Sequence, residues 1–105
     1  MKDNDALEIL LDGIDTNLIG TPRKISFKTG CRKSLWNKNC ISIGLSAGFL
    51  EPLESTSLYL IQAGISKFIT LFPTAEISDL VRNEYNKQML KEFYQVRDFI
   101  ILHYK

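Results

Sequence analysis

The residues best suited to chemistry stand together in one stretch, residues 44–57, which reads G-L-S-A-G-F-L-E-P-L-E-S-T-S. Small residues from Gly44 to Gly48 allow another group to approach the backbone closely, because little side chain intervenes. Residues 55–57 fall where a helix is expected to begin, and the free N–H groups and dipole of a helix start can bind a small anion. Glu54 adds a carboxylate one residue before this start, in an otherwise apolar stretch.

Each of these features also has a purely structural interpretation. Small residues after a strand can simply relieve crowding. Ser or Thr at a helix start is an ordinary N-cap, and Glu in a first turn complements the helix dipole. The residues alone therefore indicate an anion or cofactor contact at a junction between a strand and a helix, and no more.

The elements that must position this stretch follow from hydrophobic periodicity. Apolar residues at i, i+3, i+4 and i+7 from Leu7 predict a short helix over 5–13, which ends at Gly13. Alternation of apolar and polar residues predicts a strand at about 24–33, and a more apolar run predicts a second strand at about 40–45. A turn near 37–39 would join them into a long antiparallel hairpin.

Two long helices are expected after the chemical stretch, at about 56–72 and 77–103. The first is apolar over most of its circumference and therefore needs more cover than a hairpin provides. The second carries one apolar stripe at four- and three-residue steps: Ile77, Val81, Tyr85, Met89, Phe93, Val96 and Ile100. The chain is thus predicted to be one α+β domain over 1–105, with a short N-terminal helix, an antiparallel hairpin and two long helices.

Composition limits the possible functions. A chain of 105 residues with 45% hydrophobic residues can form one domain, and a net charge of +1 gives no reason to expect nucleic acid or an anionic membrane as partner. No apolar run is long enough for a membrane span, and the N-terminus lacks the apolar core of a signal peptide, so we expect a cytoplasmic protein. Two cysteines and one histidine predict no metal site.

The stretch at 44–57, preceded by N-C-I-S-I at 39–43, resembles the signature of flavin-dependent tryptophan halogenases. The resemblance continues through L-Y-L-I-Q-A-G-I at 58–65 and resumes with R-D-F-I-I-L-H-Y at 97–104. It implies that the chain is a piece of the FAD-dependent halogenase and monooxygenase fold. It further implies reduced FAD as cofactor, chloride or bromide as the halide, and tryptophan or an indole-like compound as the aromatic substrate.

The resemblance also implies roles for single residues. Glu54 and Ser55 match catalytic positions between flavin and substrate, where the glutamate orients the reactive halogen species and assists aromatic substitution. Cofactor contacts match Gly48, Pro52, Leu53, Thr56 and Ser57, and the backbone of the last two matches the halide pocket. The family pattern has glycine where this chain has Ser57, so a positive φ at that position would strain the serine.

Other parts of the family pattern are missing from the chain. There is no G-x-G-x-x-G fingerprint for the FAD pyrophosphate, no W-x-W-x-I-P motif and no match to the reactive lysine. The leading interpretation is a halogenase fragment that is inactive alone. The alternatives are a non-catalytic helical interaction module and a piece of a halide-independent flavin monooxygenase. The wide apolar face of the helix at 56–72 predicts a homo-oligomer, or association with a missing FAD-binding portion.

Overall fold

The computed structural model describes residues 3–15, 18–51, 53–73 and 76–105. Its helices are α1 (Asp3–Asp12), α2 (Thr56–Leu71) and α3 (Asp79–His103). Its strands are β1 (Gly30–Cys31), β2 (Trp36–Asn37), β3 (Cys40–Ile41) and β4 (Gly48–Phe49). Two short 3-10 turns, η1 (Gly44–Ser46) and η2 (Leu53–Ser55), complete the order. The α+β class predicted from the sequence is confirmed.

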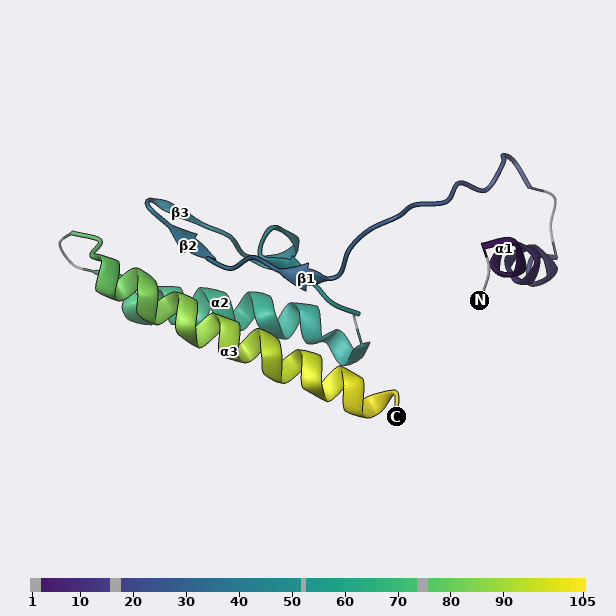
Figure 1. Cartoon of the computed structure of the whole chain (residues 1–105). Helices are drawn as coiled ribbons and strands as arrows, with labels where there is room; N and C mark the ends of the chain where they lie inside the picture. Colours follow the sequence, from purple (N-terminus) through teal and green to yellow (C-terminus); the bar gives the residue numbers. More distant parts are fainter. Residues whose placement is uncertain (1–2, 16–17, 52, 74–75) are drawn as a thin grey trace.

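Helix α1 lies apart from the rest of the chain. Residues 18–29 run as an extended, exposed arm that separates α1 from the body formed by the strands and the two long helices (Figure 1). The radius of gyration is 18.8 Å, whereas a compact chain of this length would have about 13 Å. The apolar face predicted for α1 is therefore exposed, including Leu7, Leu10 and Leu11.

The strands correct the predicted hairpin. The segments 24–33 and 40–45 do not pair along their lengths. Instead β2 pairs with β3 around a turn at Lys38, and β1 pairs separately with β4, which places Gly30 opposite Phe49. The alternation at 24–29 produces no strand. Phe27 packs edge-to-face against Phe49 of β4, with ring centroids at 5.3 Å, but backbone pairing with β4 begins only at Gly30.

The second predicted strand ends early for a local reason. After β3 the chain turns into η1, where Gly44 adopts a φ of 66°. The Ser46 hydroxyl then accepts a hydrogen bond from the Ile43 N–H at 3.1 Å and donates one to the Ile43 carbonyl at 2.8 Å. Ser46 thereby satisfies the backbone of Ile43 within the turn, so that Ile43 needs no partner strand.

The core lies where the β2–β3 hairpin meets α2 and α3, which run side by side (Figure 1). Trp36 is 3% exposed and packs edge-to-face against Phe68 of α2 and Tyr85 of α3, with ring centroids at 5.3 and 5.6 Å. The apolar stripe predicted for the last helix is buried at Tyr85, Met89, Phe93, Val96 and Ile100. Outside the core, the apolar face of α2 stays exposed at residues such as Leu58 and Ile69.

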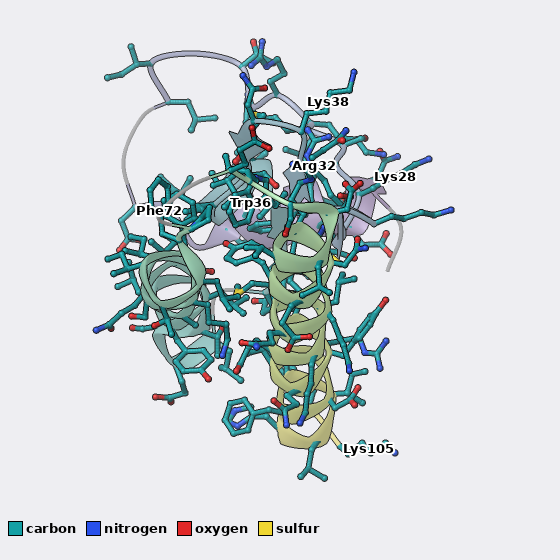
Figure 2. The ribbon with its side chains drawn as sticks, turned by 90° about the vertical axis from the view of Figure 1, so that its left-hand side faces the viewer. Lys28, Arg32, Trp36, Lys38, Phe72 and Lys105 are labelled. Carbon is teal, nitrogen blue, oxygen red and sulfur yellow. The ribbon has the colours of Figure 1, made fainter. Side chains whose placement is uncertain are left out.

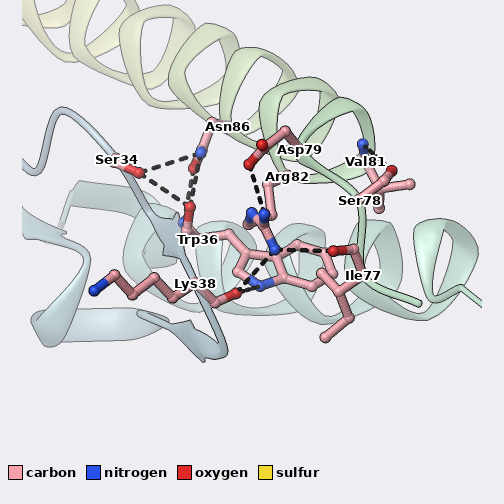
Figure 3. A network of polar contacts seen from close by, with 9 residues as sticks. All are labelled: Ser34, Trp36, Lys38, Ile77, Ser78, Asp79, Val81, Arg82 and Asn86. Atoms are coloured by element: carbon pink, nitrogen blue, oxygen red, sulfur yellow. Dashed lines mark hydrogen bonds and ion pairs between the residues drawn. The ribbon is translucent and has the colours of Figure 1, made fainter.

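Asn86 of α3 fastens the hairpin to the helix through four hydrogen bonds (Figure 3). Its Oδ1 accepts the N–H groups of Leu35 at 2.8 Å and Trp36 at 2.7 Å. Its Nδ2 donates to the Trp36 carbonyl at 2.9 Å and to the Ser34 hydroxyl at 3.2 Å. One amide side chain thus replaces a neighbouring strand for the backbone of residues 35 and 36.

Candidate functional site

A cavity of about 70 Å³ lies between the 42–50 segment, α2 and α3. It contains three of the residues singled out in the sequence, Gly48, Thr56 and Ser57. The rest of its wall is mainly apolar and includes Leu45, Ala47, Leu60, Ile61, Tyr85, Met89 and Phe93. The stretch 44–57 therefore folds back on itself, so that its glycine-rich start and its helical end face the same space.

The backbone around Gly48 explains why that residue is small. A Cβ atom on Gly48 would lie 2.6 Å from the Gly30 carbonyl oxygen and 2.7 Å from the Cα of Cys31, both in β1. The close approach predicted for this glycine is thus made by the chain's own neighbouring strand. A flavin contact at Gly48 stays a prediction of the family resemblance.

The turn immediately before α2 is strained. Glu54 has φ and ψ of 49° and 37°, and Ser55 has 58° and 24°, so two consecutive residues with side chains are left-handed. Each such residue costs about 1–2 kcal/mol relative to a right-handed conformation. The Ser55 side chain makes no capping hydrogen bond. Ordinary N-capping therefore does not account for the left-handed conformation of Ser55. Strain of this kind at residues other than glycine is concentrated at functional sites.

Ser57, by contrast, carries no such strain. It lies in the first turn of α2 and is not among the described residues with a positive φ. The serine that replaces the family glycine therefore keeps its backbone N–H in a right-handed helical conformation. Beside it, Thr56 is 9% exposed, and its hydroxyl donates a long hydrogen bond of 3.5 Å to the Glu51 carbonyl.

The remaining predicted residues lie outside the cavity wall. The side chains of Glu54 and Ser55 are exposed, and Leu53 is half-buried. Pro52 lies outside the described residues. The chain by itself therefore places Thr56 and Ser57 in the cavity wall and leaves Glu54 exposed.

Sequence reasoning placed Tyr85 in the packing stripe of α3 but did not connect it with the site. Tyr85 is 1% exposed, and its hydroxyl donates to the carbonyl of the buried Gly64 in α2 at 3.4 Å. Burial raises the pKa of this phenol above its usual value. The available signal was Gly64 itself, since a glycine inside an apolar helix often marks a close approach by another element.

Within the described ranges, no three His, Cys, Asp or Glu side chains are grouped so that they would hold a metal ion. A search of the same residues found no helix with the length and apolar character that crossing a membrane requires.

Comparison with solved structures supports the fold. BrvH, a flavin-dependent halogenase from Brevundimonas sp. BAL3, is 47% identical with a TM-score of 0.83, and the match covers 100% of this chain and 21% of BrvH. Xcc4156, a flavin-dependent halogenase from Xanthomonas campestris, is 39% identical with a TM-score of 0.79, covering 99% of this chain and 21% of that one.

Sequence comparisons agree with this result. The 7-chloro-L-tryptophan 6-halogenase KtzR of Kutzneria sp. (strain 744) is 36% identical over 81 residues, which are 77% of this chain and 16% of KtzR. The chain thus spans about a sixth of the length of the curated relatives it matches. The family model for tryptophan halogenase matches residues 1–105. The resemblance seen in the sequence is therefore confirmed, and the chain belongs to the tryptophan halogenase family.

Proposed function

We propose that this chain supplies the flavin-edge and halide-contact segment of a flavin-dependent halogenase, and that it does not halogenate by itself. The observation that carries the proposal is the left-handed pair Glu54–Ser55 directly before α2. Folding tolerates about 2–4 kcal/mol of local strain there, although glycine at either position would remove it. The pair sets the direction in which α2 begins, and therefore where the first amides of α2 lie.

The residues present fit a flavin edge and a small anion. Bound reduced FAD would supply two electrons to oxygen, and the oxygen-derived oxidant would then oxidise the halide. Thr56 and Ser57, in the first turn of α2, line a cavity whose wall is otherwise mainly apolar, and amides at a helix start bind anions without a cationic side chain. In this proposal Gly48, Pro52 and Leu53 contact the flavin, while Thr56 and Ser57 also bind chloride or bromide.

Glu54 and Ser55 would act on the aromatic substrate, tryptophan or an indole-like compound. A carboxylate beside the reacting ring can orient the oxidised halogen and stabilise the positive charge that develops on the ring. Glu54 is exposed in this chain, so its enclosure must come from protein that the chain does not contain. We accordingly propose association with an FAD-binding portion, or with a second copy, in the cytoplasm.

A non-catalytic interaction module is the second candidate, and two observations favour it. The glycine at position 48 is required by the chain's own strand, and the Glu54 carboxylate is exposed. Both are compatible with a halogenase-like sequence kept only for its fold. A third candidate, part of a halide-independent flavin monooxygenase, shares the flavin contact but not the anion site.

Titration of FAD with the purified chain, followed by flavin fluorescence anisotropy with and without bromide, separates the three candidates. Binding that bromide strengthens supports the halogenase segment. Binding that ignores bromide indicates the monooxygenase, and no binding of flavin indicates the interaction module.

Two substitutions at one position then test the anion site. Ser57→Ala keeps the N–H and should retain the bromide effect. Ser57→Pro removes the N–H at a position in the first helical turn, where proline is tolerated, and should abolish the effect. Glu54→Gln is the folding control: an exposed side chain without a hydrogen bond to the described residues should change the unfolding free energy by less than about 0.5 kcal/mol.

A further inference from the structure

The near-zero net charge conceals a strong separation of charge along the chain. Residues 16–50 contain six of the thirteen basic residues and none of the twelve acidic ones. Residues 1–15, which include α1, contain five acidic residues and one basic residue. An acidic helix is therefore joined directly to a basic arm and hairpin.

Basic and apolar side chains of this basic part line one hollow. The hollow has a volume of about 360 Å³, and its lining includes Lys28, Arg32, Leu45 and Phe49. Leu45 is 79% exposed, and the Arg32 Nε donates to the Ser46 carbonyl at 2.6 Å, which holds the guanidinium at the rim. In the part of the chain that the structure describes, no carboxylate pairs with Lys28 or Arg32.

Other basic side chains lie on the same side of the molecule as the hollow. Figure 2 shows Lys28, Arg32 and Lys38 on one side of the molecule, away from Phe72, which directly follows α2. Lys33 adds a further exposed cation between them in sequence. The described residues place no carboxylate within ion-pair distance of these four side chains, so their charge is available to an acidic partner.

Helix α1 has the complementary pattern. Leu7, Leu10 and Leu11 form an apolar face and are 41%, 53% and 37% exposed. Glu8 and Asp12, four residues apart, form an acidic stripe along one edge of that face. Neither carboxylate has an ion-pair partner among the described residues. The helix thus presents apolar side chains flanked by negative charge, and the hollow presents apolar side chains flanked by positive charge.

We propose that α1 of one copy of this chain docks in the basic hollow of a second copy, reciprocally, to form a symmetric dimer with exchanged helices. The arm at 18–29 leads α1 away from its own body (Figure 1), so a second body is the one that α1 is positioned to reach. A two-fold arrangement lets each copy donate one helix and accept one, which buries two apolar faces at once. Attraction between the charged edges fixes the partner and the orientation. This assembly does not depend on flavin or halide binding.

Sedimentation velocity across the micromolar range tests the proposal on the full chain. We expect a dimer whose dissociation constant rises about tenfold or more between about 0.1 M and about 1 M NaCl, because the Debye length falls from about 10 Å to about 3 Å. Removal of residues 1–15 should leave a monomer. The fluorescence of the buried Trp36 verifies that the body stays folded in each variant.

Charge reversal gives the sharper test. The acidic-side variant Glu8→Lys/Asp12→Lys and the basic-side variant Lys28→Glu/Arg32→Glu should each be monomeric. An equimolar mixture of the two should dimerise again, because each helix then meets a hollow of opposite charge. Lys87→Glu/Lys91→Glu, which changes two exposed lysines on α3, is the matched control and should dimerise like the wild type.

Three results would overturn the proposal. A wild-type chain that remains monomeric at all concentrations lacks the dimer. Self-association that survives both reversals comes from another surface, such as the exposed face of α2. Two reversed variants that do not recombine show that charge pairing between α1 and the hollow does not hold the copies together.

Discussion

Asn86→Ala should separate the hairpin from α3. The substitution removes the oxygen that accepts the N–H groups of Leu35 and Trp36, at 2.8 and 2.7 Å. Both residues are 3% exposed, and an unpaired buried donor costs about 1–3 kcal/mol. With two donors affected, we expect a loss of about 2–4 kcal/mol, a large fraction of the roughly 5–15 kcal/mol that stabilises a chain of this length.

Urea unfolding measures this loss. Trp36 is the only tryptophan and lies in the core, so its fluorescence reports the contact directly, while far-UV circular dichroism reports the helices. At about 2 kcal/mol per molar urea, the unfolding midpoint should fall by about 1–2 M. Fluorescence should change before the helical signal does, because the hairpin loses its anchor while α2 and α3 still pack together.

Two further substitutions calibrate the Asn86 result. Asn86→Asp keeps the acceptor but loses the donations to the Trp36 carbonyl and the Ser34 hydroxyl, and should cost about 1 kcal/mol. Ser34→Ala removes an exposed partner and should cost about 0.5 kcal/mol or less. If Asn86→Ala were no more destabilising than Ser34→Ala, the argument that one amide satisfies the hairpin backbone would be refuted.

Three other expectations concern single positions. Gly48→Ala should destabilise the chain by about 2–3 kcal/mol in thermal unfolding, because the new Cβ meets the β1 backbone. The control Gly20→Ala should leave the stability unchanged, because nothing lies within 4 Å of the new atom. Ser55→Gly should stabilise by about 0.5 kcal/mol by relieving the left-handed strain; a loss would mean that the serine is held by contacts that strain does not outweigh. Tyr59 donates to Glu92 at 2.6 Å, which is the main cause of a lowered Glu92 pKa and of a raised Tyr59 pKa. The bond therefore stabilises the folded chain at pH values above the usual glutamate pKa, and this stability is lost as pH falls through the lowered pKa of Glu92. It is also lost as pH rises through the raised pKa of Tyr59. Tyr59→Phe should flatten both limbs of a stability–pH profile, and an unchanged profile would contradict the assignment.

The two long helices could be predicted from the sequence because their signals are local. The expected ranges 56–72 and 77–103 became Thr56–Leu71 and Asp79–His103. Four- and three-residue spacing marks the buried stripe of α3 whatever lies opposite. The start of α3 is also local, since the Ser78 hydroxyl accepts the Val81 N–H at 3.3 Å.

The strands could not be predicted in the same way, because a strand needs a neighbour. Residues 24–28 alternate correctly, yet backbone pairing with β4 begins only at Gly30. The pairs that form are set by distant features: Gly48 admits β1 at close range, and Asn86 takes the place of a strand beside Trp36. Neither feature leaves a periodic pattern in the sequence.

For the site, the sequence identified the stretch but not its geometry. Gly48, Thr56 and Ser57 do share one cavity wall. The strain at Glu54 and Ser55 was not foreseen, because neither residue type favours a left-handed backbone and only the surrounding structure can hold it. The possible backbone strain from a positive φ was expected at Ser57. The positive φ values lie instead two and three residues earlier, at Ser55 and Glu54.

The contact between Gly64 and Tyr85 has a consequence for the shape of the cavity. A Cβ on Gly64 would lie 3.3 Å from the Tyr85 hydroxyl and 3.5 Å from the Met89 methyl group, and both of those side chains bound the cavity. The end of the Tyr85 side chain would have to shift slightly to admit a methyl group there, although position 64 is two helical turns, about 10 Å, from Ser57. A substitution at position 64 therefore alters the shape of the cavity from inside the helix pair, at a distance from the first amides of α2.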